Sequence, residues 1–370
     1  MFLKRMALQH YRNYDNVQIE TDANVNIFIG PNAQGKTNLL EAIFVMALTK
    51  SHRTSKDKEL ISWNGSAAQL HSEIEKKYGA VTLDLSISAL GKKAKINGLE
   101  QRKLSNFIGA LNVVMFAPED LEIVKGAPGI RRRFLDMEIG QVQPAYLHDL
   151  SQYHKILLQR NNALKAMNPG GASNQALMDV WNEQLVSYGT KIMKKRQNFI
   201  NKLQIWAERI HSGITGGTEQ IRIDYAPSFG SKDIGDETIV FEQFMLKLSQ
   251  VKDQEFRRGM TLVGPHRDDL VFSINGKDVQ TFGSQGQQRT TALSLKLAEI
   301  ELIREEVGEY PILLLDDVLS ELDQSRQTQL IETFQNKVQT FITTTGIESV
   351  NLNKLKAAKI FQVRDGSIMQ

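Results

Sequence analysis

The chain has 370 residues, of which 41% are hydrophobic and 24% charged, with a formal net charge of +3 at pH 7 and no cysteine. These values predict a soluble globular protein large enough for a main domain and a smaller one, and they exclude disulfides and cysteine-ligated zinc. No apolar run has the length of a membrane span or of a secretory leader, so we expect a cytoplasmic protein, and the small charge neither requires nor excludes nucleic acid.

The first strong motif follows two short predicted strands at residues 2–8 and 17–19. Val25–Ile29 is an apolar run typical of a buried strand, and apolar residues at helical spacing follow the motif from Leu39 onward. Between them lies a segment that fits G-x-x-x-x-G-K-[ST] at every fixed position: Gly30, Pro31, Asn32, Ala33, Gln34, Gly35, Lys36 and Thr37. Strand, glycine loop and helix in this order predict a nucleoside triphosphate site, and the alternative is a glycine-rich turn that matches by chance.

The chemistry of this loop depends on four of its residues. Gly30 and Gly35 allow the backbone to curl so that successive N–H groups point at a phosphate chain. The helix that begins near Lys36 adds the positive end of its dipole, and the Lys36 ammonium is expected to reach the β- and γ-phosphates. The Thr37 hydroxyl is a candidate ligand for Mg²⁺.

The remainder of residues 1–125 is predicted to form one mixed α/β lobe. Residues 81–87 alternate strictly between apolar and polar, which indicates a half-buried strand. Lys92–Ile96 is a second strand, followed by Asn97-Gly98, a strong hairpin-turn signal. Asn112–Phe116 is predicted to be another strand.

In residues 126–258 the apolar pattern changes from strand-like to helical spacing. After a Gly/Pro cluster and the basic run Arg131–Arg133, two apolar stripes at helical spacing are joined by a turn at 168–174, which predicts an antiparallel helical hairpin. One helix over 176–212 would extend about 55 Å, which favours a projecting arm. Two long helices packed flat on the lobe remain the alternative. A strand at Ile221–Tyr225 and an amphipathic helix around 238–250 complete this segment.

Two groups of basic residues lie in this inserted segment. Arg131–Arg133 form one group, and Lys191, Lys194 and Lys195 form the other. They are candidate contacts for a nucleic-acid backbone, although most such runs are only solvated faces.

Residues 259–370 begin with predicted strands at Met260–Val263, Leu270–Ile274 and Lys277–Thr281. A helix is then predicted through about Glu306, and Ser284 and Gly286 lie where it begins. This helix start is either a second anion-binding N-terminus or an ordinary capped helix after a glycine turn.

The segment from Pro311 to Asp317 has four consecutive apolar residues followed by two carboxylates. This pattern predicts a buried parallel strand with acids at its C-terminal edge, where the phosphates of the glycine loop are expected. There Asp316 would hold Mg²⁺, directly or through water, and Asp317 would activate the attacking water. A strand that ends in solvated acids is the alternative, and a final strand is predicted at Thr340–Thr343.

Taken in order, these motifs resemble the head of an ABC-type ATPase. The resemblance implies an α/β fold with a P-loop, a mixed sheet with helices and an inserted helical or coiled-coil hairpin arm, with residues 1–125 and 259–370 as the two halves of the head and 126–258 as the arm. The helical insertion is similar to the chromosome-maintenance branch of these ATPases. Five stretches resemble the bacterial RecF family in particular: Tyr11–Tyr14, Phe116–Leu121, Arg132–Asp136, Gly264–Asp269 and Phe282–Thr290.

The resemblance implies a function and a set of partners. It implies a weak ATP hydrolase that uses ATP and Mg²⁺, dimerises on ATP, binds junctions or gaps in DNA, and helps to load recombinase during DNA repair and replication together with RecO- and RecR-type proteins. Arg12 would lie near the phosphates, Ser284, Gly286 and Gln287 would cap the γ-phosphate bound to the other subunit, and Asp323 would cross the dimer seam.

The sequence departs from the general ABC pattern at three places. Asp317 stands where most relatives carry Glu, Thr344 or Thr345 takes the place of the switch histidine, and no glutamine follows the Asn112–Phe116 strand. These departures agree with slow hydrolysis, in which ATP acts mainly as an adhesive between subunits. Two other functions remain open, a motor subunit of a membrane transporter and a P-loop phosphotransferase.

Overall fold

The computed structural model describes residues 1–166, 172–230, 234–321, 326–327, 330–331, 337–346 and 358–369. The chain divides into two compact units. The first contains residues 1–121, 213–217 and 292–370, and the second contains residues 122–212 and 218–291. Residues 259–291, which the sequence division assigns to the head, therefore cluster with the second unit.

The first sheet of the first unit is antiparallel throughout and has the strand order β2-β1-β4-β5-β6-β7. Its strands are β1 (Phe2–Tyr11), β2 (Tyr14–Glu20), β4 (Ala67–Lys76), β5 (Gly79–Ser88), β6 (Gly91–Ile96) and β7 (Leu99–Glu100). The predicted strands at 2–8, 17–19, 81–87 and Lys92–Ile96 are confirmed, and β4 is an addition. Its burial alternates through Ala68, Leu70, Ser72 and Ile74, but one of these buried positions is the polar Ser72, which interrupts the apolar alternation in the sequence.

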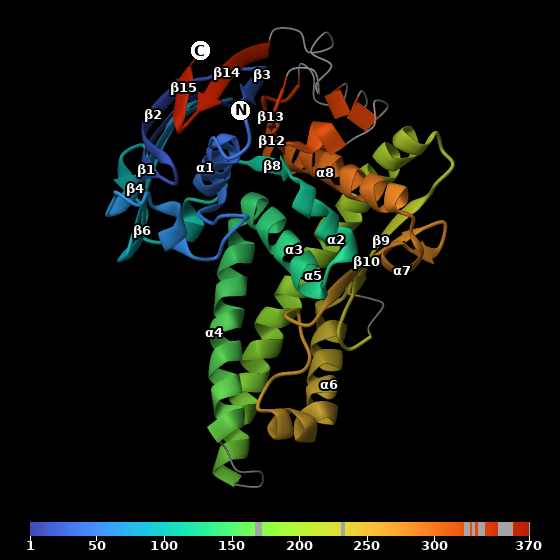
Figure 1. Cartoon of the computed structure of the whole chain (residues 1–370). Coiled ribbons are helices and arrows are strands. Elements are labelled where there is room, and N and C mark those ends of the chain that lie inside the picture. Colours follow the sequence, from blue (N-terminus) through green and yellow to red (C-terminus); the bar gives the residue numbers. More distant parts are fainter. Residues whose placement is uncertain are drawn as a thin grey trace. The chain divides into compact units, whose positions relative to one another are not determined.

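The second sheet has the order β15-β14-β3-β13-β12-β8, in which five strands run parallel and β15 is antiparallel to β14. Its strands are β3 (Val25–Ile29), β8 (Val113–Phe116), β12 (Ile312–Asp316), β13 (Thr340–Thr344), β14 (Ala358–Arg364) and β15 (Ser367–Met369). Four of these strands were predicted. The expectation that the strand at Thr340–Thr343 is the last one is wrong, because β14 and β15 follow it (Figure 1).

Helix α1 (Lys36–Leu48) contacts strands of both sheets, as Figure 1 shows. Nearly all of its residues are buried, so it has no polar face, as expected for a helix covered on both sides. The other helical pieces here are η1 (Asp57–Leu60), η2 (Leu104–Asn106), η3 (Pro118–Asp120), η4 (Val318–Glu321) and most of α8 (Gln285–Val307), whose first turns belong to the second unit.

The second unit is mainly helical. Its helices are α2 (Leu121–Lys125), α3 (Pro128–Val142), α4 (Pro144–Ala166), α5 (Ala172–Thr215), α6 (Glu237–Arg258) and α7 (Val279–Phe282), and its strands are β9 (Ile221–Ala226), β10 (Asp269–Ile274) and β11 (Lys277–Asp278). Hydrogen bonds pair the start of α4 with the middle of α5 and the end of α4 with the start of α5, so the predicted antiparallel hairpin is confirmed. None of the helices in the described part of the chain combines the length and apolar character needed to cross a lipid bilayer.

Two sequence predictions fail in this unit for local reasons. Met260–Val263 forms no strand, because two of its backbone N–H groups bond to side chains and not to a neighbouring strand. Thr261 N donates to the Asn161 side chain, and Leu262 N donates to the Glu255 side chain. The predicted strand Lys277–Thr281 is only two residues long, because the Asp278 carboxylate accepts from Thr281 N and caps α7.

Candidate nucleotide-binding site

The glycine loop joins β3 to α1, as the motif requires. Gly35 has a φ of 115° and ends the loop, while Ala33 has a φ of 64°, so the backbone curls through the left-handed region. A Cβ at Gly30 would lie 2.2 Å from the carbonyl oxygen of Val363 on β14. Gly30 has no positive φ, so the first glycine of the motif is required by close backbone packing, whereas Gly35 provides the left-handed turn.

The Lys36 side chain folds over this loop. Its Nζ donates to the carbonyl oxygens of Gly30 at 2.6 Å and Pro31 at 2.7 Å. Burial lowers the pKa of Lys36, and the negative charges of Asp317 and Asp316 oppose that shift. The ammonium is thus held at the loop, near Asp316 at the end of β12 and Asp317 directly after it.

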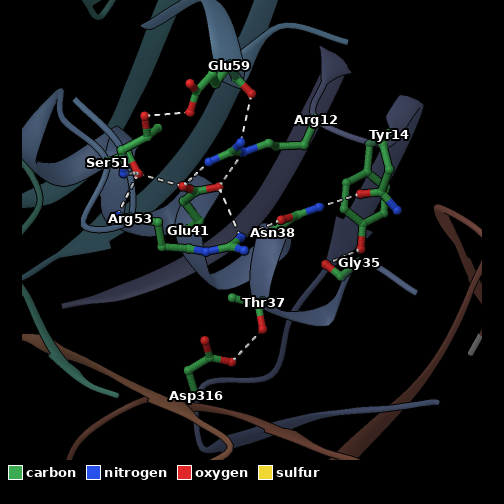
Figure 2. Close-up of polar contacts among 12 residues, drawn as sticks. Arg12, Tyr14, Gly35, Thr37, Asn38, Glu41, Ser51, Arg53, Glu59 and Asp316 are labelled. Carbon is green, nitrogen blue, oxygen red and sulfur yellow. Dashed lines mark hydrogen bonds and ion pairs between the residues drawn. The ribbon is translucent and has the colours of Figure 1, made fainter. Parts of the chain in front are cut away.

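Asp316 lies at the end of β12 and accepts two hydroxyl donors. Its Oδ1 accepts from Thr37 Oγ1 at 2.9 Å and from Thr343 Oγ1 at 2.7 Å (Figure 2 draws the Thr37 bond). Burial raises the pKa of Asp316, the two hydroxyl bonds oppose the shift, and the nearby charge of Glu119 adds to it. The sequence prediction that Thr37 and Asp316 lie together is therefore matched by the geometry.

The environment of Asp316 suits a magnesium ion. Mg²⁺ is bound in proteins by one or two oxygen side chains together with substrate phosphates and water, and Thr37 and Asp316 supply a hydroxyl and a carboxylate beside the glycine loop. The described residues contain no group of three His, Cys, Asp or Glu side chains arranged to hold a metal without such a substrate. The donor set thus fits a metal that arrives with a nucleotide.

Thr343 is a site residue that the sequence reasoning missed. It lies on β13 directly opposite Asp316 in the parallel register, is buried, and its Oγ1 also accepts from Asp317 N at 3.0 Å. Asp317 itself has a φ of 54°, which turns the chain sharply after the strand. The sequence analysis places Thr344 or Thr345 at the switch-histidine position, just beyond Thr343, and in the structure the Thr344 hydroxyl donates to the carbonyl of Gly346, two residues after β13. Only the pairing of β12 with β13 reveals the role of Thr343.

Glu119 is a second missed residue. It follows β8, which is the parallel neighbour of β12, and it is exposed at the edge where Asp316 lies. Its charge is close enough to raise the pKa of Asp316. The sequence signal that could have found it is the acidic Glu119 itself, which follows the Asn112–Phe116 strand where the general ABC pattern has a glutamine.

The β1–β2 turn braces the glycine loop. Asn13 Nδ2 donates to the Gln34 carbonyl at 3.0 Å, and the Tyr14 hydroxyl donates to the Gly35 carbonyl at 3.0 Å. Asn38 Nδ2 on α1 donates to Asn13 Oδ1 at 2.8 Å, so turn, loop and helix form one bonded group (Figure 2).

Arg12 lies beside this group but is bound to Glu41. Its Nε and Nη2 donate to the two carboxylate oxygens at 2.8 and 2.6 Å, and the Ser51 hydroxyl adds a bond of 2.6 Å to the same group (Figure 2). Glu41 is completely buried on α1, and these donors lower the pKa of Glu41 against the effect of burial. In this structure the guanidinium of Arg12 thus neutralises a buried acid.

The start of α8 belongs to the second unit. Ser284 Oγ accepts from Gln287 N at 3.2 Å, and Gln287 Oε1 accepts from Ser284 N at 2.9 Å, which is a reciprocal capping box. Gln287 also donates to Glu219 at 2.9 Å, and the Gly286 carbonyl accepts from Thr290. Ser284 is exposed at this helix start, whereas Asp323 lies outside the described residues.

The basic groups predicted as DNA contacts are largely occupied. Arg131 is buried and forms a two-bond pair with Asp269, so its assignment to a basic surface is wrong. Lys194 pairs with Glu237 at 2.8 Å and Lys195 with Asp149 at 2.7 Å. Lys194 thus pairs α5 with α6, Lys195 pairs α5 with α4, and Arg131 pairs α3 with β10.

Comparisons with known proteins agree with this geometry. The sequence matches the family described as RecF/RecN/SMC N terminal domain over residues 2–369. It is 54% identical over 368 residues to the DNA replication and repair protein RecF of Geobacillus sp. (strain WCH70), covering 100% of this chain and 98% of that protein, and the values are the same for RecF of Bacillus cereus (strain AH820).

Solved structures give the same answer for the fold. The chain is similar to the recombination mediator protein RecF in the RecFOR pathway, solved as RecF-ATPrS and as RecF-ATP. The two TM-scores are 0.92 and 0.91 at 34% identity, with 99% and 100% of this chain and 97% of each solved chain covered. An Smc head domain from Pyrococcus furiosus is similar in fold, with a TM-score of 0.54 at 16% identity. That alignment covers 99% of this chain and 95% of the solved Smc chain. The chain therefore belongs to the RecF family of DNA replication and repair proteins and has the ABC-like ATPase fold with a helical insertion.

Proposed function

We propose that this chain is an ATP-dependent recombination mediator that closes into a dimer on DNA. The observation that carries the proposal is the meeting of Thr37, Asp316 and Thr343 at the mouth of the Gly30–Thr37 loop. A triphosphate bound there would meet the backbone N–H groups of the loop, an ammonium and a magnesium-binding pair within one short stretch of sheet edge.

Each side chain has a distinct role in this proposal. Lys36 would leave the Gly30 and Pro31 carbonyls and bind the β- and γ-phosphates. Thr37 and Asp316 would hold Mg²⁺, which when bound offsets the charge of the phosphates. Asp317 would orient the attacking water and accept its proton, and its short side chain agrees with slow hydrolysis.

The second copy would complete the site. Ser284 caps α8, and Gly286 and Gln287 lie in its first turn, where the helix dipole favours an anion, so this helix start would meet the γ-phosphate held by the other subunit. Asp323 would lie at the same seam. In functional terms residues 1–125 and 259–370 would form the head and 126–258 its arm, with residues 259–291 belonging to the head by role although they cluster with the second unit.

The proposed DNA and protein partners follow from the relatives. The similar solved structures are of a recombination mediator in the RecFOR pathway, so we infer junctions or gaps in DNA as the site of action and RecO- and RecR-type proteins as partners. Work on chromosomal DNA would place the protein in the cytoplasm, in agreement with its lack of cysteine.

The test is the mass of the protein in solution with and without ATP and Mg²⁺. Wild type is expected to double its mass with ATP, whereas Lys36→Met is expected to stay monomeric, because it lacks the phosphate-binding charge. Ser284→Asp keeps a good helix cap but places a negative charge at the γ-phosphate, so it should bind ATP and fail to dimerise. Wild type that remains monomeric in saturating ATP and Mg²⁺ would disprove the proposal.

A further inference from the structure

The turn between β14 and β15 lies directly against the glycine loop. Asp365 N donates to the side-chain oxygen of Gln34 at 2.7 Å, and Gly366 N donates to the Gln34 carbonyl at 3.2 Å. Gln34 is one of the variable positions of the loop motif, so the motif itself does not explain why its side chain is held. Its partners come from residues more than 300 positions away in the sequence.

The same Gln34 carbonyl accepts a second hydrogen bond, from another turn. Asn13 Nδ2, in the turn between β1 and β2, donates to it at 3.0 Å, and the Tyr14 hydroxyl bonds the next carbonyl, that of Gly35. The two turns also touch each other, since a Cβ at Gly366 would lie 2.3 Å from the Asn13 carbonyl oxygen. The loop is therefore clamped between two hairpin turns.

Strand β14 extends this contact to the beginning of the loop. It pairs in parallel with β3 as far as Gln362 opposite Ile29, which places Val363 beside Gly30. There the backbones approach so closely that a Cβ at Gly30 would meet the Val363 carbonyl oxygen at 2.2 Å. Both ends of the loop are thus fixed by the β14–β15 hairpin.

We propose that the Asp365-Gly366 turn is a positioning element of the nucleotide site, which holds Gln34 so that the loop is shaped for triphosphate before ATP arrives. A loop that is already ordered loses less conformational freedom on binding, and this raises its affinity without any new contact to the ligand. The inference rests on the proposed ATP function, and it adds residues from β14–β15 that touch no phosphate.

The structure offers a matched pair of substitutions to test this. Asp365-Gly366 and Asn97-Gly98 are hairpin turns with the same pair of positive φ angles, 48° and 69° in the first and 50° and 78° in the second. An alanine at either glycine position has to adopt the left-handed backbone conformation, which costs free energy of folding in both variants. Only at Gly366 does the new Cβ strike a neighbour, because no atom lies within 4 Å of a Cβ at Gly98.

Gly366→Ala is expected to weaken ATP binding at least about 10-fold relative to Gly98→Ala, which should bind like wild type. In steady-state assays the loss should appear mainly in KM and much less in kcat at saturating ATP. The unfolding temperature without nucleotide should be lower for Gly366→Ala than for Gly98→Ala, because only at Gly366 does the new Cβ strike a backbone atom, so ATP affinity is compared at a temperature at which both variants are folded. Equal ATP affinity of Gly366→Ala and Gly98→Ala would overturn the proposal, whereas wild type that does not bind ATP at all would remove the proposed function as well.

A second variant guards against misfolding of Gly366→Ala. Gln34→Ala removes only the acceptor of the Asp365 N–H and should also weaken ATP binding. The double variant Gln34→Ala/Gly366→Ala should bind little more weakly than the worse single variant, because both changes break one clamp. Fully additive losses would mean that the two residues act separately, which would contradict the proposal.

Discussion

One hydroxyl group, that of Thr343, serves both acids at the end of β12. It donates to Asp316 and accepts from the backbone N–H of Asp317. Removing it takes one donor from a buried carboxylate and one acceptor from the Asp317 N–H, and a buried polar group that is left unsatisfied costs about 1–3 kcal/mol.

Thr343→Val keeps the shape of the side chain and removes this hydroxyl, whereas Thr343→Ser keeps it. We expect ATP hydrolysis to fall about 10-fold or more in the valine variant and to stay within about 3-fold of wild type in the serine variant. Steady-state hydrolysis measured across a Mg²⁺ titration provides the test. A valine variant as active as wild type would exclude a positioning role for Thr343.

His266 makes the stability of the second unit dependent on pH. Burial lowers its pKa from 6.5 to about 4, and its ring bonds the Tyr153 hydroxyl at 2.7 Å. Because the folded pKa lies below the unfolded one, the unfolded state binds the proton first as the pH falls. Stability from the neutral ring is therefore complete above about pH 6.5 and is lost as the pH falls toward 4.

His266→Gln should abolish this dependence. Between pH 7 and pH 5 the wild type is expected to lose about 2 kcal/mol more unfolding free energy than the variant. Urea unfolding at the two pH values measures the difference, with the same comparison at pH 7 and pH 8 as the control, where the two proteins should change equally. Parallel losses at pH 5 would contradict the assignment.

At the scale of elements, the α4–α5–α6 bundle contains a buried ion pair. Arg160 on α4 donates to Glu255 on α6 at 2.6 Å, to Asn182 on α5 at 2.8 Å and to Thr261 at 2.7 Å, and both charged side chains are almost completely buried. Neither charge reaches water if its partner is removed.

Arg160→Met and Glu255→Leu are each expected to destabilise the second unit by about 3–5 kcal/mol, because each leaves one buried charge alone. The double variant should be more stable than either single one, since it removes both charges. Thermal unfolding of the three variants tests this, and a double variant with the summed loss would contradict it.

The sequence predicted those elements whose signals are local. The glycine loop, the alternating strand at residues 81–87 and the helical hairpin all have their pattern within one segment. The sequence does not predict helix α3, because the Gly/Pro cluster before it indicates a break, whereas in the structure Pro128 occupies the first helical position, where proline is favoured. Strand β14 is stabilised by its pairing with β3, a long-range contact that its own residues do not reveal.

For the site, the sequence predicted the residues that carry a motif and missed those placed by strand pairing. Lys36, Thr37 and Asp316 were predicted and lie together. Thr343 is beside Asp316 because β13 is the parallel neighbour of β12, and Asp365 is beside Gln34 because β14 is the neighbour of β3. Both placements depend on the order of strands in the sheet, which a single sequence does not reveal.

At the scale of the whole molecule, we expect DNA binding to depend on ATP and on salt. Binding through phosphates releases counterions, so raising the salt from about 50 to 200 mM should weaken binding roughly 1,000-fold if about six phosphates are neutralised. Fluorescence anisotropy with gapped DNA measures this. Lys195→Ala should keep the wild-type slope, because Asp149 already neutralises that ammonium, and salt-independent binding would contradict the DNA assignment.

The order of strands in the second sheet has a consequence for biosynthesis. The β3 segment leaves the ribosome early, yet its two neighbours are β13 and β14, which are made after the whole second unit. The apolar Val25–Ile29 strand must therefore wait unpaired through most of translation, while the inserted helices can fold at once. A nascent chain stalled before residue 340 would leave this strand unpaired and open to aggregation. Chaperones that bind apolar segments of nascent chains should therefore matter more for this protein than for one whose nucleotide-binding sheet is contiguous in sequence.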